Sequence, residues 1–192
     1  MKHNIGLVGC GKWSEIVIQE IQKNENFNLK AIVCKNNYDF IRFSKIKIYK
    51  NFEQMIDQDD IDCLYISKDP HTNYLIFKNL HKNIPVIFEK PISENFESSK
   101  AIYDYSLNHR ICFMTNLPNI YSSTFDITKN FLEKKNDEIY KINFFDGNFG
   151  PFRENIHPIL DWGIHPLSYM IKLFSLNNLN QFSHRYLKKN IK

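Results

Sequence analysis

The stretch that decides the fold is Asn4-Ile5-Gly6-Leu7-Val8-Gly9-Cys10-Gly11-Lys12-Trp13-Ser14, near the start of the chain. An apolar run typical of a β-strand breaks into Gly-x-Gly, and a helix-like segment follows. In such a turn, backbone N–H groups and the positive end of the helix dipole face one point, and glycine lets the backbone approach a pyrophosphate. A plain strand-to-helix turn is the alternative. The pattern predicts a nucleotide cradle made of Gly9, Cys10, Gly11, Lys12 and Trp13.

Short apolar segments alternate with helix-like segments through the first 115 residues. The predicted strands are Ile5–Val8, Leu29–Cys34, Ile46–Tyr49, Cys63–Ser67, Val86–Phe88 and Ile111–Met114. The predicted helices are Glu15–Lys23, Tyr38–Phe43, Phe52–Asp57, Asn73–His81 and Phe96–Leu107. This alternation is typical of parallel βαβ units. The sequence therefore predicts an α/β fold of the Rossmann type, a doubly wound parallel sheet with ligands at the carboxyl ends of its strands.

Composition excludes several classes of protein. The 192 residues carry 25 basic and 21 acidic side chains, and a scattered charge of +4 is too weak to indicate nucleic-acid binding. We expect no membrane partner, because no apolar stretch approaches the roughly 18 residues of a membrane span. Residues 9–13 interrupt the first apolar run, so no secretory leader is expected either. The four cysteines lack metal-ligand spacing. We therefore expect no metal site, reduced and mostly buried thiols, and a cytoplasmic location.

The alternation stops near Thr115. Beyond it, the sequence predicts a helix at Tyr121–Lys134, a strand at Ile139–Phe145 and an apolar helix at Leu160–Phe174. We expect a nucleotide-binding domain over residues 1–115 and a partial, incomplete α+β domain for substrate binding and oligomerisation over residues 116–192. One strand cannot form a stable sheet, and an apolar helix face needs a partner surface. We therefore expect loose packing and self-association through this second region.

Three groups of polar residues carry candidate chemistry. Asp69-Pro70-His71 and Glu89-Lys90-Pro91 follow the fourth and fifth predicted strands, at the edge where this fold binds ligands. The second proline favours an extended Lys90, whose amine then points out of the strand end. Asp161 and His165 are four residues apart, so an α-helix would put both on one face, where the carboxylate can orient the imidazole as a base. An exposed loop lysine and a surface Asp–His pair are the alternatives.

Together these motifs resemble those of the glucose–fructose oxidoreductase, inositol dehydrogenase and MocA (Gfo/Idh/MocA) family of NAD(P)-dependent oxidoreductases. Gly9-Cys10-Gly11 is similar to its nucleotide fingerprint, Glu89-Lys90-Pro91 to its Glu-Lys-Pro motif, and Asp161–His165 to its Asp-x-Gly-x-His motif. The segment Ile66–His71 looks like the family's loop beside the nicotinamide ribose. The motifs agree in order and approximate spacing over almost the whole chain.

The resemblance implies a reaction and a set of roles. Hydride would pass between a nicotinamide cofactor, NAD or NADP, and a hydroxyl carbon of a sugar, sugar nucleotide or polyol. Lys90 would lie beside the nicotinamide and the substrate hydroxyl, His165 would be the acid/base, and Asp161 would bind or orient the substrate. Outside the glycine turn, the implied cofactor-binding residues are Lys35, Asp69, Pro70, His71, Glu89 and Lys90.

Three features depart from the family pattern. Ser14 replaces the third glycine of the fingerprint. Lys35 replaces the acidic residue of NAD-preferring members, which favours NADP because a cation attracts a 2′-phosphate; a solvent-facing lysine is the alternative. Only 27 residues follow His165, where family members continue into a broad open sheet. The two hypotheses are therefore a dehydrogenase and a truncated, non-catalytic nucleotide-binding remnant of that family.

Overall fold

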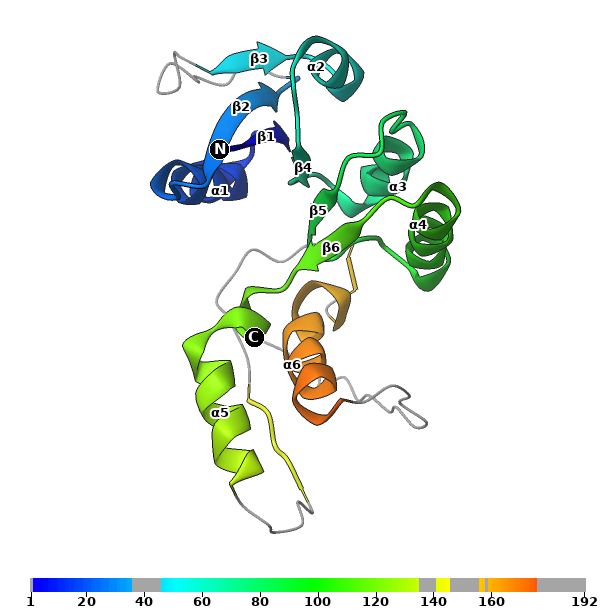
Figure 1. The fold of residues 1–192 in the computed structure, drawn as a ribbon. Helices are drawn as coiled ribbons and strands as arrows, with labels where there is room; N and C mark the ends of the chain where they lie inside the picture. The colour runs from blue at the N-terminus through cyan, green and yellow to red at the C-terminus, as the bar shows by residue number, and fades with distance from the viewer. Residues whose placement is uncertain (1, 36–45, 135–140, 146–155, 158, 176–192) are drawn as a thin grey trace, which may run out of the picture. The chain divides into compact units, whose positions relative to one another are not determined.

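A single parallel sheet organises the first part of the chain (Figure 1). The computed structural model describes residues 2–35, 46–134, 141–145, 156–157 and 159–175. The strands are β1 (His3–Val8), β2 (Phe27–Val33), β3 (Lys47–Tyr49), β4 (Cys63–Ile66), β5 (Val86–Glu89) and β6 (Phe113–Asn116). Their order is β3-β2-β1-β4-β5-β6, and every neighbouring pair is parallel. The chain reverses direction across the sheet between β1 and β4, which confirms the predicted doubly wound α/β class.

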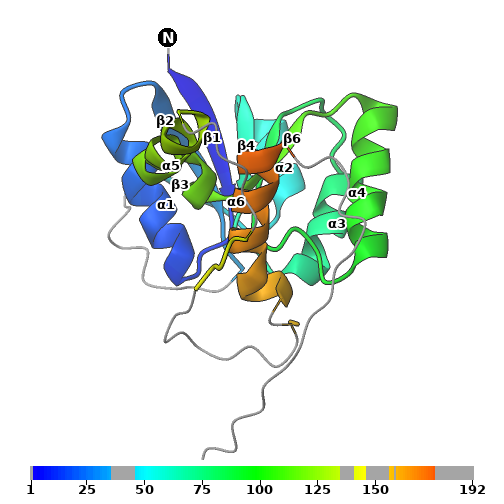
Figure 2. The same cartoon turned by 90° about the horizontal axis from the view of Figure 1, so that it is seen from below.

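Helices cover both faces of this sheet. They are α1 (Lys12–Lys23), α2 (Phe52–Gln58), α3 (Pro70–Lys78) and α4 (Phe96–His109). One buried apolar cluster joins α2, α3 and α4 to strand residues such as Ile66 and Phe88, and a second joins α1 to Ile5 and Leu7. Figure 1 shows α1 on one side of the sheet and α3 and α4 on the other, and Figure 2 shows α3 and α4 side by side. The central strands β1 and β4 are therefore mostly buried, as parallel strands usually are, whereas the edge strands β3 and β6 are more exposed.

Most predicted elements of this region are present, with shifted ends. The sixth strand begins at Phe113, two residues later than predicted. Helix α3 begins at Pro70 instead of Asn73, because Asp69 caps it and proline suits the first helical turn. The helix predicted at Tyr38–Phe43 lies outside the described residues.

The described residues divide into two compact units. The first contains residues 2–35, 46–117, 156–157 and 159–164, and the second contains residues 118–134, 141–145 and 165–175. The second unit holds the short helix η2 (Pro118–Tyr121), α5 (Ser123–Glu133) and α6 (Ile164–Phe174). Tyr169 of α6 packs edge-on against Phe125 of α5, with ring centroids 4.9 Å apart, and its hydroxyl donates to Thr128 Oγ1 at 3.0 Å. Of the helices that the structure describes, none is long and apolar enough to cross a membrane.

In the later part of the chain, one predicted strand is wrong and one predicted helix begins differently. Residues 141–145 form no strand, although the sequence predicts one over Ile139–Phe145, whose first two residues lie outside the described part. Phe145 is 96 % exposed, so its apolar character does not reflect burial in a sheet. The helix predicted at Leu160–Phe174 is present, but its first turn is π-helical, η3 (Ile159–Gly163), and α6 follows it directly. Pro166 lies in the first turn of α6, where its missing N–H breaks no intrahelical bond.

Candidate nucleotide and substrate site

The first glycine of the Gly-Cys-Gly turn brings three strand ends together. Gly9 has φ +126°, and a Cβ atom there would lie 2.1 Å from the carbonyl oxygen of Ser67, just after β4. The Gly9 N–H donates to the Val33 carbonyl at the end of β2, at 3.0 Å. Only glycine adopts this conformation easily and fits this close approach. The turn therefore crosses the sheet edge at the switch point between β1 and β4, where doubly wound folds bind their ligands.

The second glycine leaves the start of α1 open. Gly11 is the N-cap of α1 and no side chain caps this helix, whereas α2, α3, α4 and α5 begin with the capping side chains of Asn51, Asp69, Asn95 and Ser122. Among the described residues, no atom would lie within 4 Å of a Cβ at Gly11. The free N–H groups of a helix N-terminus next to open space suit an anion such as a pyrophosphate.

Ser14 adds a buried polar atom beneath this turn. Its side chain is 1 % exposed, and its Oγ would lie 3.5 Å from a Cβ at Gly9. Within the part of the chain that the structure describes, this hydroxyl has no hydrogen-bond partner. The small side chain still allows α1 to pack closely on the sheet, as the third glycine of the fingerprint would.

The end of β2 lies next to the same turn, and a disulfide there contradicts the prediction for the cysteines. Cys34 follows β2 and forms a disulfide with Cys10, with Cα atoms 5.6 Å apart. Cys63 is half-buried and free, and Cys112 is free and exposed. The prediction of reduced thiols is therefore wrong for Cys10 and Cys34, and the prediction of burial is wrong for Cys112. The two bridged cysteines are 24 residues apart, a spacing that does not predict a disulfide. Only the parallel pairing of β1 with β2 brings Cys10 and Cys34 together. Lys35, the predicted NADP-selecting residue, comes next and is exposed.

A hydrogen-bonded network connects side chains near the carboxyl ends of β4, β5 and β6. Glu89 ends β5, and its Oε1 accepts hydrogen bonds from the Tyr65 hydroxyl and, at 2.8 Å, from Asn116 Nδ2 at the end of β6. Burial and the hydrogen bond to Glu89 raise the pKa of the Tyr65 phenol far above its ordinary value, while hydrogen bonds from Trp13 and Asn116 act in the opposite direction. Tyr65 thus stays a donor and holds the carboxylate. Sequence motifs indicate Glu89 but not Tyr65 or Asn116. The signal for these two residues is a polar side chain near the carboxyl end of an apolar strand.

Lys90 and Asp161 meet in the first compact unit. Lys90 Nζ donates to the Asp161 backbone carbonyl at 2.5 Å and lies 3.3 Å from its Oδ1. The same ammonium group is 5.4 Å from the centre of the Trp162 ring, which favours a cation over its face. The two side chains are only 16 % and 20 % exposed. The Lys90–Pro91 peptide bond is cis. The structure therefore joins two of the predicted catalytic residues, which are 71 positions apart.

His165, the third predicted catalytic residue, belongs to the second compact unit. It lies in the first turn of α6 and is 9 % exposed. Asp161 lies in the π-helical turn η3, so the two residues do not share the one regular α-helix on which the prediction of a common face rested.

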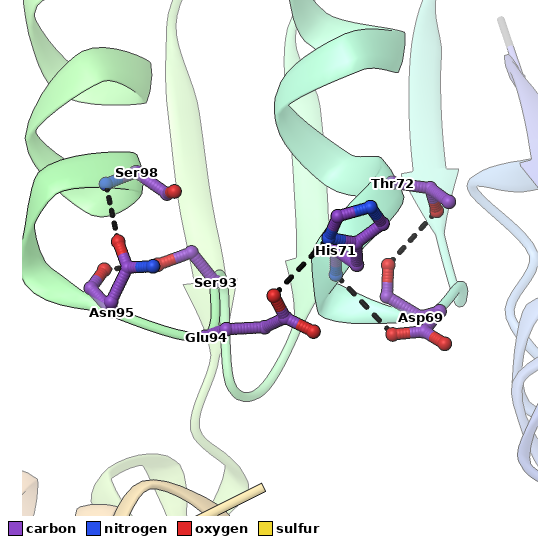
Figure 3. A network of polar contacts seen from close by, with 7 residues as sticks. All are labelled: Asp69, His71, Thr72, Ser93, Glu94, Asn95 and Ser98. Atoms are coloured by element: carbon purple, nitrogen blue, oxygen red, sulfur yellow. Dashed lines mark hydrogen bonds and ion pairs between the residues drawn. The ribbon is translucent and has the colours of Figure 1, made fainter. Parts of the chain in front are cut away.

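The predicted loop residues Asp69, Pro70 and His71 lie at the start of α3 (Figure 3). The Asp69 carboxylate accepts a hydrogen bond from the His71 backbone N–H at 3.3 Å and so caps the helix. The His71 ring points toward Glu94, with Nδ1 3.2 Å from Oε2, and its side chain is 72 % exposed. Both polar side chains thus have partners within the protein, and their nearest neighbours belong to α3 and the loop before α4.

A family model identifies the chain. The model, described as an oxidoreductase family with an NAD-binding Rossmann fold, matches residues 3–116. The chain belongs to this Gfo/Idh/MocA family. No curated protein sequence matches the chain significantly.

Solved structures support the same fold. An NAD-binding protein from Listeria innocua aligns with a TM-score of 0.69 at 19 % identity, over 90 % of this chain and 55 % of that one. Apo scyllo-inositol dehydrogenase from Lactobacillus casei aligns with a TM-score of 0.63 at 18 % identity, over 69 % of this chain and 41 % of that one. D-galactose-1-dehydrogenase from Rhizobium etli aligns with a TM-score of 0.62 at 22 % identity, over 69 % of this chain and 43 % of that one. The chain spans about half the length of these proteins or less.

Proposed function

We propose that this chain is an NAD(P)-dependent oxidoreductase acting on a hydroxyl carbon of a sugar, sugar nucleotide or polyol. The observation that carries the proposal is the pairing of Lys90 with Asp161, next to the carboxyl end of β5. An ammonium group held by a carboxylate at the edge that binds the nucleotide is placed to meet a polar substrate group. Two dehydrogenases among the structural neighbours are named for scyllo-inositol and D-galactose, which motivates the substrate class.

The cofactor is NAD or NADP, bound by the glycine turn. The open space beside Gly11 and the uncapped N-terminus of α1 would receive the pyrophosphate, and Ser14 Oγ is a further polar atom beneath it. Lys35, exposed after β2, would attract a 2′-phosphate, so we propose a preference for NADP. Asp69, Pro70, His71 and Glu89 are proposed to contribute from the neighbouring loops and strand end.

The proposed chemistry divides among three side chains of this chain. The bound nicotinamide supplies the hydride acceptor. Lys90 would donate a hydrogen bond to the substrate oxygen as negative charge develops on it. Asp161 would orient the lysine, as the 3.3 Å ion pair allows. His165 would accept the hydroxyl proton, because an imidazole exchanges protons near neutral pH.

The second candidate is a chain that binds nucleotide but does not turn over substrate. It is favoured by the family match, which covers residues 3–116 and is described by its NAD-binding fold. Both candidates share a cytoplasmic location and have neither nucleic-acid nor membrane partners. They also share self-association through the second unit.

Calorimetry and activity assays test the proposal. Gly11→Val should abolish NADP binding without unfolding the chain, since nothing described lies near its Cβ and only the ligand space is filled. Equal affinity for wild type and Gly11→Val would contradict the cradle. Lys90→Met and His165→Asn should remove turnover of a confirmed polyol or sugar substrate and keep cofactor binding. Lys100→Met is the matched control, because Lys100 pairs with Asp104 on the exposed face of α4. NADP binding with no turnover of any sugar or polyol by wild type would favour the second candidate.

A further inference from the structure

The Cys10–Cys34 disulfide joins two segments that the proposed cofactor would contact. Cys10 is the middle residue of the glycine turn, and Cys34 lies between β2 and Lys35. The Cys34 end is firmly held, because its N–H donates to the Tyr49 carbonyl at 2.8 Å and its side chain is 5 % exposed. The bridge thus ties the turn that faces the pyrophosphate position to a fixed strand end.

The bridge is not needed to hold these strands together. β1 and β2 already pair in parallel through six residue pairs, and the Gly9 N–H donates to Val33. The bridged pair also adjoins an apolar cluster that contains Ile5, Leu7 and Ile32. In compartments that keep thiols reduced, a disulfide that adds little to an existing sheet is more often transient than structural.

We propose that Cys10 and Cys34 are a reversible redox pair, a thiol modification site that sets the nucleotide affinity of the glycine turn. The bridged form binds nucleotide more tightly than the dithiol form. This inference rests on the proposed nucleotide binding at the same turn.

The chemistry needs a small-molecule disulfide as oxidant. Cys10 is half-buried and Cys34 is buried, so the Cys10 thiolate attacks the small disulfide first, forms a mixed disulfide and releases one thiolate. The Cys34 thiolate then attacks Cys10 Sγ and releases the second. The chain loses two electrons, the oxidant becomes two thiols, and the two cysteine protons pass through solvent to the released thiolates. A dithiol reductant reverses both steps.

The bridged form should bind nucleotide more tightly because the disulfide restrains the glycine turn. Among the residues that the bridged structure describes, no side chain caps α1 and none lies near a Cβ at Gly11, so the binding conformation is already present. The dithiol form gives Cys10 and its neighbours more freedom, which is lost when the ligand binds. By linkage, a nucleotide that prefers the bridged form must also protect the bridge from reduction by the same factor.

The experiment compares the full chain in two redox states. The chain is treated with dithiothreitol or with oxidised glutathione, freed of reagent, and titrated with NADP by calorimetry. Alkylation under denaturing conditions, counted by mass, should add four groups to the reduced chain and two to the bridged chain, since the sequence has four cysteines. We expect about tenfold tighter NADP binding by the bridged form, within the usual range of coupling between two sites.

Two variants serve as controls. Cys34→Ala should bind NADP with the same affinity after either treatment, because no bridge can form. Cys63→Ala removes a free thiol from neighbouring β4 and should keep the full difference. Saturating NADP should raise the dithiothreitol ratio needed for half-reduction of wild type by the same factor as the affinity ratio.

The outcomes separate the inference from the proposed function. Equal NADP affinity in both states, or tighter binding by the dithiol form, overturns the inference and leaves nucleotide binding intact. Four alkylated groups after both treatments overturn it as well, because no bridge then forms. NADP binding in neither state overturns the proposed function and this inference with it.

Discussion

At the scale of single residues, the site depends on polar groups that satisfy one another at strand ends. Glu89 accepts from both Tyr65 and Asn116, and Asn116 Nδ2 also lies 2.8 Å from the Tyr65 hydroxyl. Tyr65 is 9 % exposed, so little water is available to replace a lost partner. Leaving a buried acceptor without its donor costs more free energy than the hydrogen bond itself contributes to stability.

Tyr65→Phe is expected to lower the free energy of unfolding by about 1 to 3 kcal/mol, since it leaves the Glu89 carboxylate with one donor fewer. Urea denaturation followed by circular dichroism measures the change. Tyr103→Phe is the matched control on exposed α4 and should stay within about 0.5 kcal/mol of wild type. A Tyr65→Phe variant as stable as the control would mean that water replaces the lost hydroxyl.

Cys63 should react slowly with thiol reagents. Burial, with smaller effects from Cys112 and Asp62, raises the pKa of its thiol from 9.0 to about 11. At pH 8 the reactive thiolate should be about a hundredfold scarcer than for an ordinary thiol, and the reaction rate should rise up to about pH 11. Because the neutral thiol is favoured in the folded chain, this group stabilises the fold below pH 9, and that contribution falls as the pH rises toward 11.

The measurement uses Cys112→Ser with the Cys10–Cys34 bridge formed, so that Cys63 is the one remaining free thiol of the four cysteines. The bridged Cys63→Ala variant, with Cys112 exposed, provides the comparison. Equal reaction rates of the two variants at pH 8 would contradict the raised pKa.

At the scale of elements, the turn between β1 and α1 uses its two glycines differently. Gly9 has a positive φ and a close backbone neighbour, whereas Gly11 has φ −81° and faces open space. The first glycine is therefore required by the fold, and the second is available for ligand binding.

Gly9→Ala and Gly11→Ala form a matched pair. Gly9→Ala should destabilise the chain by roughly 2 kcal/mol or more, because the new methyl meets the Ser67 carbonyl in a disfavoured backbone conformation. Gly11→Ala should cost under about 1 kcal/mol, since alanine is only a poorer N-cap than glycine. Urea unfolding of the two variants gives the comparison, and equal losses would refute this division of roles.

Sequence patterns predict elements well where one physical cause dominates. β1, β4 and β5 were found because strands buried on both faces are almost wholly apolar, and α1 because glycine precedes it. The strand prediction for residues 141–145 was wrong because apolar, β-prone side chains such as Phe144 and Phe145 are exposed there. Among the described residues, no strand pairs with this segment. In the site, Lys90 and Asp161 were found through motifs. Tyr65 and the Cys10–Cys34 bridge were missed because they depend on strand pairing.

At the scale of the whole molecule, the two compact units differ in burial. The first has two buried apolar clusters. In the described part of the second unit, only Phe125 and His165 are buried, while Ile127 and Phe131 of α5 are 68 % and 58 % exposed. Exposed apolar side chains gathered on one helix favour association with another surface.

The isolated chain is therefore expected to self-associate through α5. Sedimentation velocity should show a concentration-dependent species larger than 22.9 kDa, and the double substitution Ile127→Lys and Phe131→Lys should shift it toward monomer. Phe96→Lys is the matched control, because Phe96 is 74 % exposed but begins α4 in the first unit. A monodisperse monomer of wild type, or an equal effect of the control, would contradict the expectation.

The position of β1 between β2 and β4 has a consequence for biosynthesis. β1 pairs with β4 through contacts such as Ile5 with Cys63, so the centre of the sheet joins segments about 60 residues apart. At a ribosome rate of about 5 to 20 residues per second, the apolar β1 emerges several seconds before β4 is made. Parallel pairing across such a separation is also slow, because a long loop must close before any contact forms. The strand that carries the glycine turn is thus the one whose second edge stays unpaired for longest during synthesis.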